Sequence, residues 1–121
     1  MSSTSIPSVG PRRALPAELI PALVDFRRRL EGAFGPRFQA LLLYGSWARG
    51  EQGPDSDVDL AVLIDDLTHA EIGEVVGLGV DTWHATECQL SVQPHDTAHF
   101  ARMVEREHPY YAAVAREGLP A

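Results

Sequence analysis

The chain has 121 residues, of which 45% are hydrophobic, and this is the length and composition of one small globular domain. Such a domain lies near the lower limit for burying a stable core unaided, so a homo- or hetero-oligomer is compatible with it. The net charge of −7 argues against a basic surface for direct nucleic-acid binding, but it allows a free nucleotide that arrives with its own metal. No apolar run is long enough to span a membrane, no signal-peptide core is evident, and Cys88 is the only cysteine; together these features predict a cytoplasmic protein without an internal disulfide.

The predicted elements alternate between helices and strands. Residues 1–14 are rich in Ser, Pro and Gly and are predicted to be a flexible leader, which leaves 15–121 as a single domain. The spacing of apolar residues and the positions of Gly and Pro then predict, in chain order, a helix from Pro16 to the Gly35-Pro36 stop, a strand over 38–44, a short helix over 46–49, a strand over 58–64, a helix from Thr68 to about Trp83, a strand over 86–93 ended by Pro94, a helix from Asp96 to about Glu107, and a helix from Pro109 to Gly118. This order indicates an α/β (α+β) fold with a small three- or four-stranded mixed sheet and packed helices.

The helix after the second predicted strand carries the clearest start signal. Thr68 and Glu71 have the spacing of a capping box, in which each side chain bonds the other residue's backbone N–H. Four apolar residues of this helix are expected to face the core: Ile72, Val75, Val76 and Val80. Three glycines in the same stretch weaken the prediction of a helix, because glycine is a poor helix former.

The most informative feature is a Gly-Ser pair after one apolar strand, followed at the start of the next strand by two alternating aspartates, Asp57 and Asp59. Side chains two apart on a strand share a face, so the two carboxylates should lie close together and repel unless a cation separates them. Magnesium is typically held by one or two protein carboxylates together with waters and phosphates. Gly45 and Ser46 can supply backbone N–H groups and a hydroxyl for those phosphates. The arrangement favours phosphoryl or nucleotidyl transfer.

The whole string resembles the signature of the minimal nucleotidyltransferases in the DNA polymerase beta superfamily. That signature is Gly-Ser, a spacer that often contains Ala-Arg-Gly, and then Ser-Asp-x-Asp-Leu, and the matching residues here are Gly45, Ser46, Ala48, Arg49, Gly50, Ser56, Asp57, Asp59 and Leu60. The resemblance implies a polymerase beta-like nucleotidyltransferase fold, catalytic aspartates at 57 and 59 that bind Mg²⁺, and nucleotide binding by Gly45, Ser46, Arg49 and Ser56. From the residues alone, Arg49 fits a phosphate contact and a surface ion pair equally well.

A third carboxylate is usual in the family, on a later strand. The candidate here is Glu87, which is predicted to share a strand face with Gln89, Ser91 and Gln93. Many relatives have an acidic residue deeper in that strand, where this chain has Gln89 or Ser91. The third ligand is therefore either Glu87, which would also be a candidate general base, or it is missing.

The resemblance implies a transferase that moves AMP from Mg-ATP to an acceptor. Larger relatives attach an acceptor-binding domain for which this chain has no room, so the expected acceptor is a protein partner, most simply a HEPN-domain toxin in a two-component toxin–antitoxin module. One alternative is a catalytically degenerate antitoxin or regulator that acts by binding alone. Another is a small-molecule nucleotidyltransferase that modifies an antibiotic, with the acceptor pocket built across a homodimer.

Three further patterns favour structural roles. His95 and His99 have the spacing of two zinc ligands, but no third ligand is evident and the start of a surface helix explains them more simply. Trp47 is expected to pack under the motif loop rather than stack on a base. Tyr110 and Tyr111 are expected to pack in the core or at an interface.

Overall fold

The computed structural model describes residues 14–121, so the predicted leader lies outside the described residues except for Ala14. The elements in chain order are η1 (Ala17–Leu19), α1 (Ile20–Phe34), η2 (Gly35–Arg37), β1 (Phe38–Tyr44), α2 (Ser46–Arg49), β2 (Val58–Ile64), α3 (His69–Thr86), β3 (Leu90–Asp96), α4 (Thr97–Glu105), α5 (Pro109–Glu117) and β4 (Leu119–Pro120). In this described part, no helix is long and apolar enough to cross a membrane.

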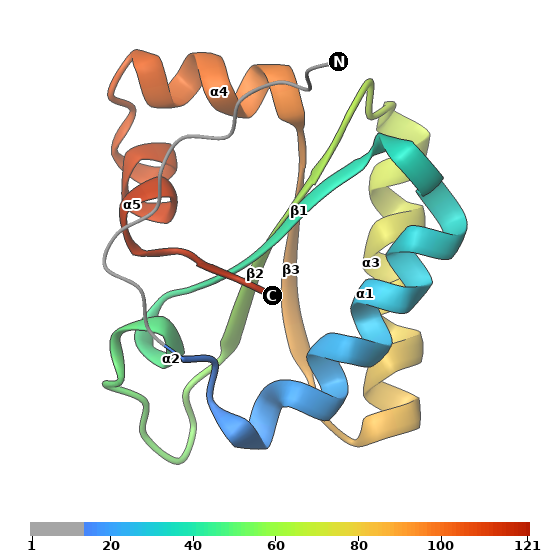
Figure 1. The fold of residues 1–121 in the computed structure, drawn as a ribbon, viewed down its shortest axis with the longest axis vertical. Coiled ribbons are helices and arrows are strands. Elements are labelled where there is room, and N and C mark those ends of the chain that lie inside the picture. The colour runs from blue at the N-terminus through green and yellow to red at the C-terminus, as the bar shows by residue number, and fades with distance from the viewer. Residues whose placement is uncertain (1–13) are drawn as a thin grey trace.

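A four-stranded mixed sheet in the order β3-β2-β1-β4 forms the centre of the molecule (Figure 1). β1 runs antiparallel to both β2 and β4, whereas β2 and β3 are parallel and are joined through α3. Helices α1 and α3 lie on one face of the sheet, and α4 and α5 lie on the other. The predicted mixed sheet with packed helices is confirmed.

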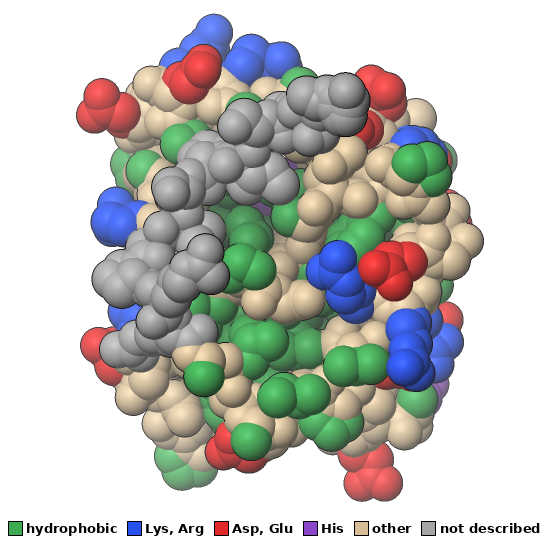
Figure 2. Space-filling view, in the orientation of Figure 1, with side chains coloured by type: hydrophobic (Ala, Val, Ile, Leu, Met, Phe, Trp, Pro, Cys, Tyr) green, Lys and Arg blue, Asp and Glu red, His purple; other side chains and the backbone are tan. Residues whose placement is uncertain are grey.

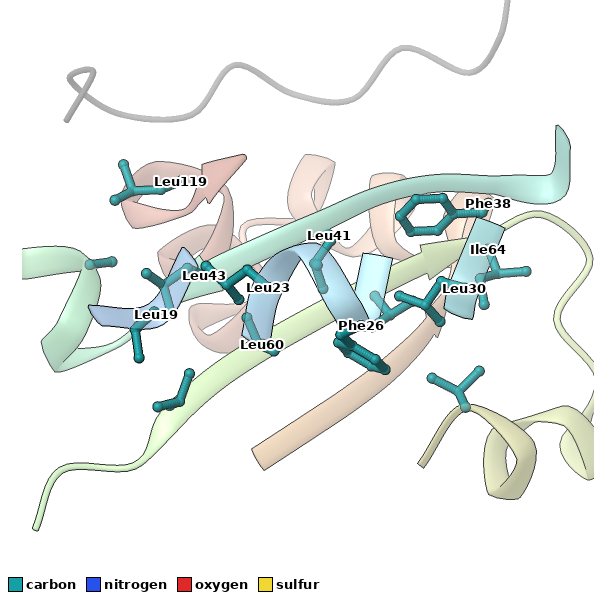
Figure 3. Close-up of a cluster of buried hydrophobic side chains, with 14 of the residues drawn as sticks. Leu19, Leu23, Phe26, Leu30, Phe38, Leu41, Leu43, Leu60, Ile64 and Leu119 are labelled. Carbon is teal, nitrogen blue, oxygen red and sulfur yellow. The ribbon is translucent and has the colours of Figure 1, made fainter. Parts of the chain in front are cut away.

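Two apolar clusters bury the two faces of the sheet. The cluster on the α1 and α3 side is the larger, and Figure 3 shows its α1 side chains pointing at alternate residues of β1 and β2. Phe26 and Leu30 of α1 are fully buried there, as the helical spacing of the sequence predicts. The smaller cluster joins Leu42, Ala61 and Leu63 to Phe100 of α4 and Val114 of α5. The alternation along β1 and β2 therefore decides which residues face each helical layer.

The region around the third strand differs from its prediction. α3 continues to Thr86 and ends with Glu87 in the left-handed conformation at φ 60°, so Glu87 lies in the connection before β3 and not on a strand. β3 starts at Leu90 and runs through Pro94 to Asp96. Proline is tolerated here because β3 is an edge strand, where one row of backbone groups needs no partner strand.

The inward face predicted for α3 is also largely wrong. Val75 is buried, but Ile72, Val76 and Val80 are 38%, 42% and 41% exposed. The buried face instead consists of Val75, Gly79 and Thr82. A Cβ at Gly79 would come within 2.9 Å of Val92 Cγ2 on β3, so this glycine allows the close approach of helix and sheet. One of the three glycines that weakened the prediction of a helix, Gly79, thus reflects packing, whereas a Cβ at Gly73 or Gly77 would meet nothing within 4 Å.

Smaller differences concern the ends of two helices and one short strand. The first helix is preceded by a 3-10 turn, so α1 itself begins at Ile20. α4 ends at Glu105, and its predicted cap is confirmed because the Asp96 carboxylate accepts the backbone N–H of His99 at 3.0 Å. The two-residue strand β4, which pairs with Leu42 and Leu43 of β1, was not predicted.

Candidate active site

The turn between β1 and α2 places Gly45 against Asp59. Gly45 has φ 76° and ψ −156°, a backbone conformation that is essentially restricted to glycine. A Cβ on Gly45 would overlap the Asp59 carboxylate at Oδ2. The Gly45 carbonyl accepts the N–H groups of Ala48 and Arg49, both at 3.1 Å, and so begins the short helix α2. The Gly-Ser turn and one motif aspartate are therefore in direct contact, although they come from different elements.

The two aspartates lie at the start of β2. Asp59 is half-buried opposite Tyr44 of β1, and Asp57 is exposed immediately before the strand. Continued one residue beyond the strand, the alternation of β2 would put both on one face. Burial raises the pKa of Asp59 above its ordinary value, the charge of Asp57 raises it further, and the charge of Arg49 opposes both effects. The charge of Asp57 thus acts on Asp59, in the direction expected for two neighbouring carboxylates.

This pair of carboxylates fits a hard divalent cation by its chemistry. Mg²⁺ binds oxygen ligands in proteins. One or two of these are usually carboxylates, and waters and phosphate oxygens supply the others. Burial is the larger cause of the raised pKa of Asp59. The charge of Asp57 adds to it, and this repulsion is what a cation between Asp57 and Asp59 would relieve. Within residues 14–121, no group of three or more His, Cys, Asp or Glu side chains is arranged to hold a metal.

Glu87 does not join the two aspartates in such a group. It is exposed at the end of α3, and the residue of β3 that pairs in register with Asp59 is Ser91. Glu87 does line the same cavity as Asp57. Its role as a catalytic acid or base stays a prediction, and the position beside Asp59 on the neighbouring strand has a hydroxyl instead of a carboxylate.

That cavity has a volume of about 690 Å³ and lies between η1, the motif loop and the start of β3. Its walls combine carboxylates with apolar groups: Glu18, Asp55, Asp57 and Glu87, and Leu19, Trp47, Pro54, Val58 and Leu90. Ser56, Cys88, Gln89 and Ser91 complete the lining. The volume falls within the range of small-molecule sites in proteins.

Arg49 is held by two carboxylates. Its Nε donates to Glu51 at 2.9 Å and its Nη1 donates to Glu117, at the end of α5, at 2.9 Å. The ion-pair alternative for this residue is thus the arrangement seen in the structure. A phosphate contact by Arg49 stays a prediction.

Ser56 and Trp47 organise the motif loop. The Ser56 hydroxyl accepts the backbone N–H of Gly53 at 2.8 Å, and the Trp47 indole donates to the Ser56 carbonyl at 3.3 Å. Trp47 packs against the larger apolar cluster, which agrees with the expected packing role, while one of its faces lines the cavity. Ser46 begins α2 beside this loop, and nucleotide contacts by Ser46 and Ser56 stay predictions.

A polar chain behind Asp59 has no counterpart in the sequence analysis. The Tyr110 hydroxyl donates to Tyr44 at 3.4 Å and lies 3.0 Å from Nε2 of His95. Burial lowers the pKa of His95 to about 4, and burial raises the pKa of Tyr110. The His95 ring packs among the rings of Phe100, Tyr110 and Tyr111. The period-two pattern of β3, which puts His95 on the face of Ser91, was the available sequence signal.

The family comparison identifies the class of domain to which this fold belongs. Residues 35–98, more than half of the chain, match the family described as Polymerase beta, Nucleotidyltransferase. The chain therefore belongs to the polymerase beta nucleotidyltransferase family. The matched segment contains β1, α2, β2, α3 and β3, and thus the whole Gly-Ser and Asp-x-Asp motif.

Comparisons with solved structures found matches at low identity. A crystal structure of a toxin–antitoxin with AMP-PNP is 22% identical, with a TM-score of 0.47, over 78% of this chain and 68% of that chain. A mutant of the toxin–antitoxin MntA-HpeT is also 22% identical, with a TM-score of 0.45 and the same coverage. No curated protein matches the chain by sequence.

Proposed function

We propose that this protein transfers AMP from Mg-ATP to an acceptor. The observation that carries the proposal is the contact between Gly45 and the Asp59 carboxylate, because it brings the Gly-Ser turn next to a carboxylate of the kind that binds a divalent cation. Asp57 and Asp59 would hold Mg²⁺, which supplies charge neutralisation at the phosphates. Gly45 and Ser46 would orient the triphosphate, with Arg49 and Ser56 at its margin.

The chain's own contribution to such chemistry is positioning and electrostatics. Nucleotidyl transfer needs little covalent participation from the protein, because most of the acceleration comes from alignment and from stabilising developing charge. The Asp59 carboxylate lies against Gly45, and Asp59 pairs in register with Tyr44 of the neighbouring strand. Glu87 lines the cavity beside Asp57, where it could accept a proton from an acceptor hydroxyl.

The proposed acceptor is a protein partner with a HEPN domain, with this chain as the antitoxin of the pair. The support for it is the motif's resemblance to small nucleotidyltransferases of that kind. The direct experiment incubates the protein and a candidate HEPN partner with Mg-ATP labelled at the α-phosphate. Label on the partner, absent with the Asp57→Asn, Asp59→Asn protein, is expected; an unmodified partner that also fails to associate would contradict the proposal.

A second function, neutralisation by binding alone, is favoured by one observation. The strand position beside Asp59 is occupied by Ser91, and no third carboxylate joins Asp57 and Asp59 in the described part of the chain. If binding alone suffices, the Asp57→Asn, Asp59→Asn protein still neutralises its partner. If transfer is required, that protein binds the partner but leaves it active.

The nucleotide site can be tested without any acceptor. We expect calorimetry to show magnesium-dependent ATP binding by the wild type and none by the Asp57→Asn, Asp59→Asn protein. A Gly53→Ala protein is a matched control, because Gly53 lies in the same loop, has open space around it and has no positive φ. Equal ATP binding by wild type and double variant would overturn the assignment of these aspartates.

A further inference from the structure

Arg49 is the arginine of the motif, and it lies close to the candidate cation site. Its backbone N–H donates to the Gly45 carbonyl at 3.1 Å, and Gly45 lies against the Asp59 carboxylate. The charge of Arg49 also lowers the pKa of Asp59, against the larger effect of burial. A phosphate bound at the Gly-Ser turn would therefore lie near this positive charge.

Two carboxylates from different parts of the chain hold the Arg49 guanidinium. Nε donates to Glu51 at 2.9 Å, and Nη1 donates to Glu117 at 2.9 Å. Glu51 lies just after α2, where its backbone N–H donates to the Ser46 carbonyl at 2.9 Å and closes the end of that helix. Glu117 is the last residue of α5, 68 residues further along the chain. The guanidinium is thus anchored by its own loop and by a helix outside the motif.

The stability of the fold gives little reason for this arrangement. Charges of both signs lie side by side at several places on the surface, as Figure 2 shows for one face. Exposed ion pairs contribute little to stability, and the side chains of Arg49 and Glu117 are 42% and 27% exposed. Within residues 14–121, however, Arg49 is the only side chain that donates hydrogen bonds to two different carboxylates. Two separate anchors restrict the rotation of a long side chain more than one anchor does.

The anchored guanidinium keeps donors for a third partner. Arginine has five N–H groups in one plane, and the hydrogen bonds to Glu51 and Glu117 use one each at Nε and Nη1. Nη2 takes part in neither bond. Arg49 can therefore donate to a phosphate oxygen without giving up either carboxylate. A side chain that is already ordered loses less freedom on binding, so this arrangement favours affinity.

We propose that Glu117 is a positioning residue of the candidate nucleotide site, because it holds the Arg49 guanidinium where that group donates to a phosphate of bound Mg-ATP. The proposal rests on the proposed function and adds to it a residue outside the motif. Glu117 does not touch the nucleotide; it acts through Arg49. The end of α5 thereby becomes part of the nucleotide site.

The sign of the effect separates positioning from charge repulsion. A carboxylate near a triphosphate repels it, so Glu117→Ala strengthens ATP binding if repulsion is the only interaction. If Glu117 positions Arg49, the same change leaves a long side chain to be ordered when ATP binds, and binding weakens. The guanidinium lies between Glu117 and the expected phosphate, and salt screens exposed charges. We therefore expect positioning to be the larger effect.

Calorimetry of Mg-ATP binding tests this with Glu117→Ala in the wild-type and Arg49→Gln backgrounds. We expect Glu117→Ala to weaken binding by about three- to tenfold when Arg49 is present, and to leave it nearly unchanged in Arg49→Gln, where nothing remains to be positioned. Glu117→Gln keeps an oxygen acceptor and should give an intermediate affinity. Glu105→Ala is the matched control, because Glu105 is an exposed acid at the end of α4, which lies far from α2 in Figure 1.

The Arg49 side chain can also be observed without nucleotide. Nitrogen-15 relaxation of its Nε–H group is expected to report a rigid side chain in the wild type and a mobile one in Glu117→Ala, with circular dichroism showing that both are folded. Unchanged mobility, tighter ATP binding by Glu117→Ala, or an equal loss in both backgrounds would each overturn the proposal. A wild type that binds no Mg-ATP would overturn the proposed function as well, whereas normal wild-type binding that Glu117→Ala leaves unchanged would overturn the positioning role alone.

Discussion

Gly45→Ala is the substitution that tests the candidate site most sharply. The added Cβ meets two independent obstacles in the structure. The first is the backbone conformation of Gly45, at φ 76° and ψ −156°, which other residues adopt only under strain. The second is the Asp59 carboxylate, whose Oδ2 occupies the place of the new methyl group. Both the fold and the candidate cation site should therefore respond.

The magnitude follows from the two obstacles. A backbone strain of this kind costs on the order of 1–3 kcal/mol. Displacing a half-buried side chain to admit one extra methyl group adds at least about 1 kcal/mol. We expect Gly45→Ala to lower the free energy of unfolding by roughly 2–4 kcal/mol, a large share of the roughly 5–15 kcal/mol of a typical domain. Gly53→Ala should stay within about 0.5 kcal/mol.

Urea denaturation of four proteins separates the two contributions. These are the wild type, Gly45→Ala, Asp59→Ala and the double variant. If the methyl group and the carboxylate compete for space, Gly45→Ala costs less in the Asp59→Ala background, with a coupling energy of about 1 kcal/mol or more. The strain contribution remains in both backgrounds. ATP binding by Gly45→Ala, measured with magnesium, should be at least about tenfold weaker if a displaced Asp59 no longer holds the cation.

Two results would refute this reasoning. A coupling energy below about 0.3 kcal/mol would mean that Gly45 and Asp59 do not compete for the same space. A Gly45→Ala protein as stable as the Gly53→Ala control would mean that the turn does not require glycine. Weak ATP binding with unchanged stability would leave the phosphate role of the turn intact and would refute only the packing argument.

Three further predictions concern charged and polar groups. The raised pKa of Asp59 means that the folded state binds more protons than the unfolded state, so the stability of the wild type falls as the pH rises through that pKa. Asp59→Asn should therefore stabilise the ligand-free protein at neutral pH and not in acid. Denaturation at several pH values checks this. Arg37 lowers the pKa of Glu71 from 4.5 to about 2, so Glu71 stabilises the fold above pH 4.5 and this stabilisation is lost as the pH falls toward 2. Glu71→Gln should therefore make the stability of the protein less dependent on pH in this range, which denaturation at several acidic pH values measures. Thr82→Val should cost about 1–2 kcal/mol in urea denaturation, because the buried Thr82 hydroxyl donates to Asp25 at 2.7 Å.

The motif and its two strands were predictable because their signals are local. β1, α2 and β2 have the predicted bounds, since apolar runs bracket a glycine turn and a polar loop. Their antiparallel hairpin places Gly45 beside Asp59, although the sequence analysis assigned the two residues separate roles. Neighbouring strands joined by one loop leave few ways to arrange the residues.

The connection after α3 was not predictable by the same rules. Glu87 takes the left-handed conformation that normally signals Gly or Asn, so nothing local marks the end of the helix there. Burial on α3 follows its contacts with α1 and β3, not its apolar spacing, and this explains the exposed Ile72, Val76 and Val80. Tyr110 reaches Tyr44 only through the packing of α5, a long-range contact for which the sequence carries no periodic signal.

The hairpin of β1 and β2 has a consequence for how the candidate site comes into being during folding. The contact between Gly45 and Asp59 closes a short loop, so little chain entropy is lost in forming it. Contacts of low sequence separation form early in folding, whereas the parallel pairing of β2 with β3 must wait for α3 to cross over. The part of the candidate site that contains Gly45 and Asp59 is therefore one continuous segment, which can assemble before α4 and α5 pack against the sheet. Such a segment can be placed in new surroundings without a change in its own internal contacts.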